Sequence, residues 1–433
     1  MQRLTYKQQV TKTVYEQLND KEITIEQAYK QWWKNPRRDG GFRLTEVGDT
    51  IFRYAGLEYH THDFKTKNNQ ENLKKRDLGQ FFTTNCDYIL QGFEPFVKGK
   101  KITDPFAGNQ DLLNWSKKNG CENAIGYDYD QKCVDNINVF FNDSLNSPKK
   151  YKFICTNPPY LHKNKSSKEL KEKFFTNDNS QFEDLYQIAL KSCFDCDEGI
   201  VIVPLNFLCA QNSSKIRELF FAKFSIVKLN IFSTQVSADT TYNVIAFYFK
   251  KNQEIKESNI IDTIIYPHNS QIKIELRKKL NWQFGGEFIK QINNTKNYLG
   301  VFRLTESIVE SGDEKIEIAI QNINQKQEIH TSKNFINLMQ KNILFLRAID
   351  SKNGKKIQLE DIRDHKIKAL IGKNTSRNMA HLIFKEPISI EDQSKIMKKF
   401  NEKLNENRQK YFSFFLTNFR DNNRKRISFD TAY

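Results

Sequence analysis

The sequence Thr-Asn-Pro-Pro-Tyr at residues 156–160 directly follows the apolar run Phe-Ile-Cys at 153–155. The apolar run predicts a strand, and the two prolines end it, because neither can donate a hydrogen bond to a neighbouring strand. The side-chain oxygen of Asn157 and the carbonyl of Pro158 are acceptors, and the ring of Tyr160 can stack on a planar group. Such a strand end can hold an exocyclic amino group. A turn that merely ends a strand is the alternative interpretation.

Length and composition favour a folded, multidomain chain. The 433 residues are enough for two or three domains, and 38% hydrophobic residues can fill sizeable cores. No apolar run approaches the roughly 18 residues of a membrane span, and the first thirty residues are too polar for a signal peptide. Of the seven cysteines, only Cys193 and Cys196 have the spacing of a metal-binding pair, and no second pair accompanies them. We therefore expect reduced thiols in a cytoplasmic protein, with no membrane association and no metal.

The positive charge is concentrated in the C-terminal part of the chain. Residues 1–80 contain 15 Lys and Arg against 11 Asp and Glu, and residues 81–250 contain 20 against 19. Residues 251–433 contain 33 against 22, which supplies most of the formal net charge of +16. This distribution is typical of a nearly neutral catalytic core beside a region that binds a polyanion. A lysine-rich solvated surface is the simpler alternative.

Residues 76–250 alternate short apolar runs with amphipathic segments. The runs that predict strands are Lys101–Thr103, Asn123–Tyr127, Phe153–Cys155, Gly199–Val203, Ile226–Ile231 and Tyr242–Tyr248. The segments that predict helices are 109–119, 131–141, 181–194 and 212–223. This alternation indicates an α/β domain with a Rossmann-like, open and mostly parallel sheet and helices on both faces. Ligands of such sheets bind beyond the carboxyl ends of the strands.

The regions on either side of this domain have weaker patterns. Residues 1–75 are predicted to form a small helical region, and residues 251–433 a basic domain of mixed α+β structure. Ser389–Gln409 is expected to be a long helix. The tail 412–433 interleaves phenylalanines with basic residues. That pattern suits base stacking and phosphate contacts, but it suits the edge of a hydrophobic core equally well.

Three polar segments should meet Asn157 at the carboxyl edge of the sheet. Asp-Pro-Phe-Ala-Gly at 104–108 follows the first strand, and its glycine lets a ligand approach the backbone at the start of a helix. Asp128 ends the next strand, where an acidic side chain can accept hydrogen bonds from both hydroxyls of a ribose. Asp143, shortly before the strand at 153–155, is placed to accept from the amino group of an adenine.

With these segments in place, the chain resembles the S-adenosylmethionine-dependent DNA methyltransferases that modify the N6 amino group of adenine. It resembles their gamma arrangement, in which the cofactor half precedes the catalytic half and a recognition domain follows. Leu78–Thr84 is similar to the family's opening motif, 104–108 to its D-P-x-x-G loop, and 157–160 is its catalytic motif as it stands. Leu229–Phe232, with the strand 244–249, resembles a later motif that supplies an aromatic ring. The resemblance covers about residues 78–250.

The resemblance implies a set of site residues and one cofactor, S-adenosylmethionine, with no metal. The implied cofactor-binding residues are Thr83, Asp104, Phe106, Gly108, Asp128, Tyr129 and Asp143. The implied catalytic residues are Asn157, Pro158, Pro159, Tyr160 and Phe232, with Tyr242 as the competitor of Phe232. The chain departs from the family at Gln110, where a second glycine is common, and at Cys155-Thr156, where an acidic or apolar pair is more usual.

The implied activity is methylation of a flipped-out adenine in a specific sequence of double-stranded DNA. The implied partner is a restriction endonuclease that acts on the same site, with residues 251–433 recognising the sequence. Alternative acceptors for the same core are RNA, the N4 amino group of cytosine and a protein glutamine. A DNA-binding module with a vestigial methyltransferase core is an alternative of a different class.

Overall fold

The computed structural model describes residues 83, 85–236, 243–293, 299–350, 356–374, 378–412, 414–419 and 424–432. All of them belong to one compact unit, Gly79–Tyr433. The predictions for residues 1–75, for 78–82 and Thr84 of the opening motif, and for Tyr242 lie outside the described residues.

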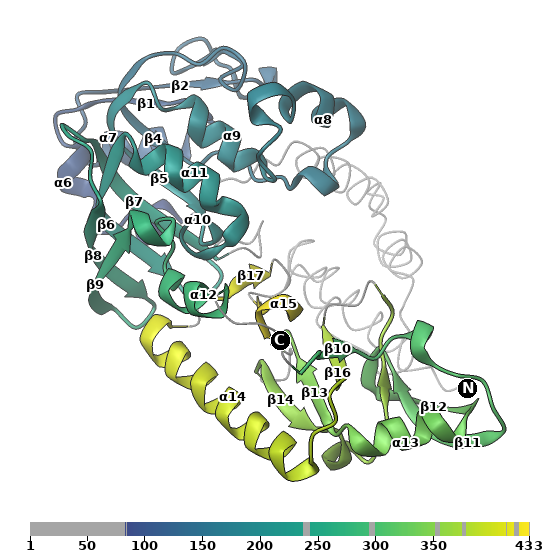
Figure 1. Cartoon of the computed structure of the whole chain (residues 1–433). Coiled ribbons are helices and arrows are strands. Elements are labelled where there is room, and N and C mark those ends of the chain that lie inside the picture. The colour runs from purple at the N-terminus through teal and green to yellow at the C-terminus, as the bar shows by residue number, and fades with distance from the viewer. Residues whose placement is uncertain are drawn as a thin grey trace, which may run out of the picture. The chain divides into compact units, whose positions relative to one another are not determined.

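Nine strands of the described chain form one large sheet. They are β1 (Lys101–Asp104), β2 (Asn123–Asp128), β3 (Val139–Phe141), β4 (Tyr151–Thr156), β5 (Cys196–Pro204), β6 (Phe224–Phe232), β7 (Val244–Lys251), β8 (Ser258–Tyr266) and β9 (Ser270–Arg277). Their order is β3-β2-β1-β4-β5-β7-β6-β8-β9 (Figure 1). Strands β3 to β5 are parallel, and β7 runs antiparallel between β5 and β6. The six predicted strands and the α/β class are confirmed.

The parallel register brings the polar strand ends together. Asp104 of β1 is paired with Gly126 of β2, and Thr103 is paired with Ile154 of β4. Because β1, β2 and β4 run in the same direction, their last residues, which include Asp104 and Asp128, lie along one edge of the sheet. This is the edge at which open α/β sheets bind their ligands.

Helices cover both faces of the sheet, as predicted. The helices of this part are α5 (Cys86–Ile89), α6 (Glu94–Val97), α7 (Asp111–Lys118), α8 (Lys168–Phe174), α9 (Leu185–Ser192), α10 (Asn206–Cys209) and α11 (Ser214–Phe221). Successive side chains of a strand point to opposite faces. Tyr248 of β7 stacks on Phe96 of α6 with ring centroids 4.0 Å apart, whereas its neighbours Phe247 and Phe249 pack against Phe220 of α11.

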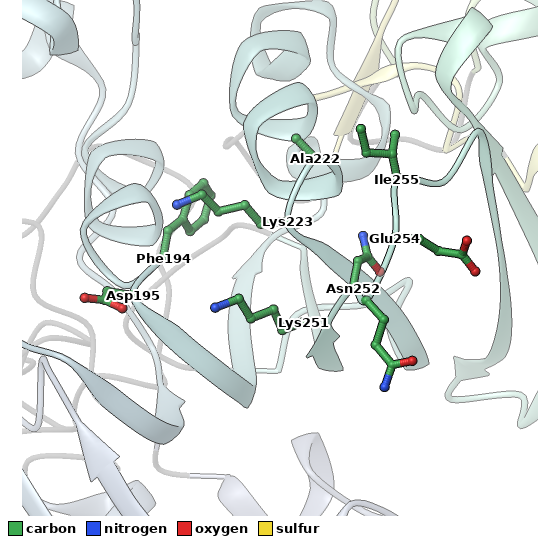
Figure 2. A pocket seen from close by; sticks show the side chains of 9 residues that line it. Phe194, Asp195, Ala222, Lys223, Lys251, Asn252, Glu254 and Ile255 are labelled. Carbon is green, nitrogen blue, oxygen red and sulfur yellow. The ribbon is translucent and has the colours of Figure 1, made fainter.

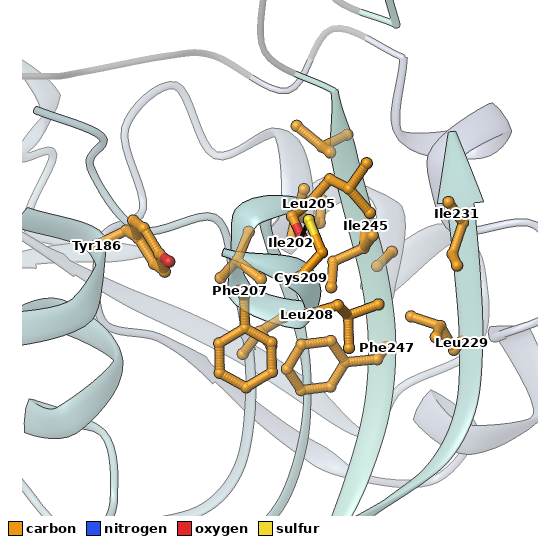
Figure 3. Packing of buried hydrophobic residues seen from close by; sticks show 14 of the residues in the cluster. Tyr186, Ile202, Leu205, Phe207, Leu208, Cys209, Leu229, Ile231, Ile245 and Phe247 are labelled. Atoms are coloured by element: carbon orange, nitrogen blue, oxygen red, sulfur yellow. Dashed lines mark hydrogen bonds between the residues drawn. The ribbon is translucent and has the colours of Figure 1, made fainter. Parts of the chain in front are cut away.

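The centre of the core lies where α10 and α11 cover β5, β6 and β7. Phe207 and Leu208 of α10 pack against Phe247 and Leu229, and all four side chains are fully buried (Figure 3). Burying a large apolar side chain contributes about 1.5–3 kcal/mol, so this layer holds the central strands, and with them the carboxyl edge, in a fixed arrangement.

The helix predicted at 131–141 is wrong. The segment forms one 3-10 turn, Gln131–Cys133, and then the edge strand β3. The carboxylate of Asp135 accepts hydrogen bonds from the backbone N–H groups of Ile137, Asn138 and Val139, at 2.8–2.9 Å. Asp side chains that bond nearby backbone groups offer an alternative to the helix, and here that alternative prevails.

The large sheet continues beyond residue 250, where the sequence analysis placed the start of the recognition domain. Strand β8 pairs in parallel with β6, and β9 pairs antiparallel with β8. The sequence patterns of both strands alternate, and the side chains of β8 are alternately exposed and buried over most of its length. The predicted boundary at residue 250 therefore falls inside this sheet.

The rest of the described chain has the mixed α+β structure that was predicted. Its strands are β10 (Phe302–Arg303), β11 (Glu314–Ile320), β12 (Asn322–Thr331), β13 (Leu344–Arg347), β14 (Gln358–Asp361), β15 (Leu370–Ile371), β16 (Met379–Ile383), β17 (Thr417–Phe419) and β18 (Arg424–Arg426). Its helices are α12 (Gly286–Asn293), α13 (Lys333–Lys341), α14 (Ile390–Tyr411) and α15 (Phe429–Ala432). The strands form sheets β10-β16-β13-β14, β12-β11-β15 and β17-β18.

Two predictions about the C-terminal part can be compared with the structure. The long helix expected at Ser389–Gln409 is α14, and Ser389 caps it by accepting from the backbone N–H of Asp392. In the tail, Phe414 and Phe415 are buried and contact Phe284 and Phe288. These contacts favour the core-edge interpretation for both phenylalanines. Within the described chain, no helix has both the length and the apolar character that crossing a membrane requires.

Candidate active site

A buried hydrogen bond joins the ends of β1 and β4. The hydroxyl of Thr156 donates to Asp104 Oδ1 at 2.6 Å, and the backbone N–H of Phe106 donates to the same oxygen at 3.0 Å. Asp104 and Thr156 are each 1% exposed. Thr156, at a position where the resemblance makes an acidic or apolar residue more usual, therefore holds Asp104 of the expected cofactor loop in place.

The loop after β1 is held against the end of β2. The backbone N–H of Gly108 donates to Asp128 Oδ2 at 2.8 Å, and that of Ala107 donates to the carbonyl of Tyr127 at 2.9 Å. A Cβ added to Gly126 would lie 2.4 Å from the Cβ of Ala107, so only glycine at position 126 allows this approach. The loop and the two acids thus form one rigid group, in which Phe106 is half-buried.

Asn157 stands at the centre of a second set of hydrogen bonds. Its Nδ2 donates to the hydroxyl of Thr83 at 2.9 Å, and its Oδ1 accepts from the hydroxyl of Tyr160. The backbone N–H of Thr83 donates to Asp111 Oδ2 at 3.2 Å. The structure therefore brings Thr83 of the opening motif, predicted to bind cofactor, directly to the predicted catalytic asparagine. Pro158 is buried and Pro159 is half-buried beside it.

The two predicted stacking rings are buried and lie in different surroundings. Tyr160 is 1% exposed, its hydroxyl lies 2.8 Å from the carbonyl of Ile202, and its ring meets Tyr186 edge-on. Phe232 is 0% exposed and stacks on Tyr266 of the neighbouring strand β8, with centroids 5.2 Å apart. Neither ring is open to solvent in this structure.

Asp143 and Tyr129, both predicted to contact the cofactor, are linked by a residue of α8. Lys173 Nζ lies 3.2 Å from Asp143 Oδ2 and 4.3 Å from the centroid of the Tyr129 ring. Tyr129 is 52% exposed, and Phe141 lies beside it with ring centroids 6.1 Å apart. The structure therefore brings the two predicted residues together, and it adds Lys173 to them.

The two carboxyl groups at the ends of β1 and β2 have raised pKa values. Burial raises the pKa of Asp104 to about 7, although the hydrogen bonds from Thr156 and Phe106 oppose the shift. Burial also raises the pKa of Asp128. Among the described residues, neither carboxylate forms an ion pair with a lysine or arginine. Each oxygen of Asp128 accepts one hydrogen bond, from the backbone N–H of Gly108 or of Asp130, and so keeps a lone pair for a ribose hydroxyl of S-adenosylmethionine, the cofactor expected here.

A large cavity lies away from these residues. It has a volume of about 560 Å³ and is lined by Phe194, Lys223, Lys251, Asn252 and their neighbours (Figure 2). Lys223 directly precedes β6 and Lys251 ends the antiparallel β7, so the cavity is at the opposite edge of the sheet from Asn157. No group of three or more His, Cys, Asp or Glu residues in the described chain is arranged to hold a metal ion.

Sequence reasoning missed three residues that shape the site. The sequence predicts no role for Thr156, it predicts only a helical position for Asp111, and Lys173 is not among the predicted site residues. Each of them pairs with a residue that is distant in the sequence. Thr156 lies 52 residues from Asp104, Asp111 lies 28 residues from Thr83, and Lys173 lies 30 residues from Asp143. The hydroxyl next to the catalytic motif was the one available signal, since a buried threonine requires a hydrogen-bond partner.

Residues 55–237 match the sequence model of a family described as Eco57I restriction-modification methylase. The match takes in β1, β2 and β4 with the loops that follow them. It supports a methyltransferase of restriction–modification type for this part of the chain. No curated protein matches the chain.

Several of the solved structures that are similar to part of the chain are described as proteins of restriction or restriction–modification systems. The chain is similar to the modification subunit of a putative type I restriction enzyme from Vibrio vulnificus YJ016, with 14% identity and a TM-score of 0.36, over 56% of this chain and 64% of that chain. The type I restriction-modification methyltransferase subunit from Streptococcus thermophilus has 13% identity and a TM-score of 0.33, over 60% and 70%. The type IIG restriction endonuclease BpuSI has 12% identity and a TM-score of 0.39, over 78% and 48%. The chain thus spans less than two thirds of the first and third of these proteins.

Proposed function

We propose that the protein transfers a methyl group from S-adenosylmethionine to the N6 amino group of an adenine in double-stranded DNA. The observation that carries this proposal is the hydrogen bond from the side chain of Asn157 to the hydroxyl of Thr83, together with the buried carboxyl groups of Asp104 and Asp128. It joins the predicted catalytic residue to the predicted cofactor site at the carboxyl edge of the sheet. The family match over residues 55–237 supports the same assignment.

Asn157 and Pro158 would hold the reacting amino group. The Oδ1 atom of Asn157 and the carbonyl of Pro158 each accept one N6 hydrogen, which localises the nitrogen lone pair that is otherwise conjugated into the ring. A carbonyl oxygen has two lone pairs, so Asn157 can keep its bond from Tyr160 while it accepts from the base. The cofactor supplies an activated methyl group, and the protein contributes chiefly orientation.

The adenine must leave the duplex to reach Asn157, at a cost of a few kcal/mol. We propose Tyr160 and Phe232 as the rings that receive it, since stacking on aromatic side chains contributes roughly 1–3 kcal/mol per base. Both rings are buried in this structure, so receiving a base requires them to move. In this structure the hydroxyl of Tyr160 also orients the side chain of Asn157.

The basic C-terminal part, residues 251–433, is proposed to recognise the DNA sequence in the cytoplasm. Its 33 Lys and Arg against 22 Asp and Glu favour contacts with the phosphate backbone. A cognate restriction endonuclease that acts on the same site is the proposed functional partner.

The proposal is tested by methyl transfer from labelled S-adenosylmethionine to duplex DNA, bulk RNA and protein extract in parallel, followed by nucleoside analysis. We expect N6-methyladenine from DNA alone. Label in RNA or protein would overturn the DNA acceptor, and cofactor binding without any transfer would favour a vestigial core.

Asn157→Ala is expected to lower kcat by about 10²–10³, the usual effect of removing one preorganised hydrogen-bonding group from a transition state. DNA affinity, measured by fluorescence anisotropy, should stay within about two-fold, because phosphate contacts supply most of the binding. The matched control is Asn164→Ala, an exposed asparagine in the segment after the same motif. Full activity of Asn157→Ala would exclude the proposed mechanism.

A further inference from the structure

The ammonium group of Lys173 makes the two contacts that an adenine ring would make at the same place. It is a donor to the carboxylate of Asp143, at 3.2 Å, as an adenine amino group would be. It also lies on the face of the Tyr129 ring, 4.3 Å from the centroid, where a planar base would stack. The side chain of Lys173 therefore contacts both Asp143 and Tyr129, which the resemblance assigns to cofactor binding.

The remaining bonds of Asp143 keep its carboxylate in place. Asn146 donates to it from the backbone N–H at 3.3 Å and from Nδ2 at 3.0 Å. These bonds fix the turn after β3, so Asp143 does not depend on Lys173 for its position. The carboxylate of Asp143 is thus fixed as a hydrogen-bond acceptor, and the ammonium group of Lys173 is the donor that contacts it in this structure.

Helix α8 holds Lys173 in position without needing this contact. Ser167 caps the helix by accepting from the backbone N–H of Leu170, and Phe174 and Phe175 at its other end are buried in the core. Lys173 itself is 32% exposed along its side chain and points to the site from this anchored helix. Its long aliphatic stem lets the ammonium group leave without moving α8.

We propose that Lys173 is an intramolecular competitor for the adenine position of the cofactor, occupying Asp143 and the face of Tyr129 until the cofactor displaces it. This inference rests on the proposed function, because it requires that S-adenosylmethionine binds at this site. It goes beyond that function by naming a residue that weakens cofactor binding and sets its dependence on salt.

The test measures the affinity of the full chain for S-adenosylhomocysteine and for adenosine by calorimetry, without any turnover. Lys173→Met keeps the stem over the Phe174 ring, whose centroid is 4.9 Å from Nζ, and removes the charge. Because partly exposed ion pairs and cation–π contacts are modest, we expect binding to become about three- to ten-fold tighter. The matched control is Lys168→Met, which replaces an exposed lysine of the same helix that pairs with Glu172. The affinity of this variant for both ligands should equal that of the wild type.

Ionic strength gives a second test, and its main measurement uses the wild-type protein alone. Salt screens the pair between Lys173 and Asp143, so wild-type affinity for the uncharged adenosine should rise between about 50 and 500 mM salt. The affinity of Lys173→Met should stay level. Weaker or unchanged binding by Lys173→Met, or a wild-type affinity that falls with salt, would overturn the competitor role alone. If neither protein binds either ligand, the cofactor assignment itself is overturned.

Discussion

Asp104 is the residue at which stability and the proposed function oppose each other. Its carboxyl group is 1% exposed, receives two hydrogen bonds, and forms no ion pair with a lysine or arginine of the described chain. Burial raises its pKa to about 7 from an ordinary value of 3.8. The folded protein therefore binds this proton more tightly than the unfolded chain does, and the contribution of Asp104 to stability falls as the pH rises from about 4 to about 7.

We predict that Asp104→Asn stabilises the protein at pH 8 by about 1–3 kcal/mol relative to the wild type, with little difference at pH 4.5. The amide keeps an oxygen for Thr156 and Phe106 but carries no charge. Urea unfolding at the two pH values measures the difference, and Asp195→Asn, at an exposed site, is the control. A variant less stable than the wild type at pH 8 would contradict the prediction.

At the residue scale, the sequence predicted which acids lie at the carboxyl edge of the sheet but not how they are held. Asp104 and Asp128 could be found because each ends a strand, and Asn157 because it directly follows one, and the ends of parallel strands share an edge of the sheet. The bonds from Thr156 to Asp104 and from Lys173 to Asp143 depend on tertiary packing, which no local pattern encodes. The burial of the Tyr160 and Phe232 rings could not be predicted either, since strand ends are usually half-exposed.

At the scale of single elements, α7 begins with an unusual residue. Gln110, at the position where the family commonly has glycine, has φ 67° and ψ 17°, a left-handed conformation. This conformation strains a residue that has a Cβ by about 1–2 kcal/mol. A bond from Gln110 Nε2 to Asp135 Oδ2, at 2.9 Å, accompanies it and links α7 to the turn before β3. Residue 110 therefore has a conformation that favours glycine, although it is a glutamine.

We predict that Gln110→Gly is more stable than Gln110→Ala by about 1 kcal/mol, because glycine alone tolerates the left-handed conformation without strain. Both variants lose the bond to Asp135, so the comparison isolates the backbone. Thermal unfolding measures it.

Asn114, an exposed position within α7, provides the control pair. There alanine should be the more stable replacement by about 0.8–1.0 kcal/mol, as in any helix interior. The same order at both positions would show that residue 110 is not left-handed in the protein.

The failed helix at 131–141 shows the limit of periodicity at this scale. The helical spacing of its apolar residues is real, but Asp135 redirects the backbone through three local hydrogen bonds. Strands β8 and β9 were missed for a related reason, since alternating polar residues on an exposed sheet face resemble an irregular segment. The central strands could be predicted because burial on both faces makes them continuously apolar.

At the scale of the whole molecule, a buried lysine joins the C-terminal tail to the catalytic part. Lys425 of β18 is 7% exposed, and its Nζ lies 3.4 Å from Asn243 Oδ1. Asn243 in turn donates from Nδ2 to the carbonyl of Phe232 at 3.0 Å. Burial lowers the pKa of Lys425 from 10.5 to about 8, while Cys209 and Asp350 oppose the shift. The unfolded chain thus binds this proton more tightly, and the contribution of Lys425 to stability rises with pH between about 8 and 10.5.

We predict that Lys425→Met stabilises the protein at pH 7 by about 1–3 kcal/mol, because the replacement fills the same space without a buried charge. The advantage should shrink by pH 10, where the wild-type amine is neutral in the folded protein. Denaturant unfolding at both pH values measures this, with the exposed Lys403→Met as control. A loss of stability at pH 7 would mean that the contacts of the ammonium group outweigh its desolvation.

The position of the tail that contains Lys425 determines where a chimera between this protein and a related one could be joined. Residues after α14 return to the catalytic part, where Cys209 Sγ donates to the carbonyl of Leu416 at 3.5 Å. The residues between β9 and the tail are therefore inserted in the sequence between two segments of the catalytic part. Under the proposed function, a chimera with a new target specificity would need two crossover points, one after β9 and one near residue 412. A single cut at residue 250 would divide the large sheet and expose the surfaces that β8, β9 and the tail cover.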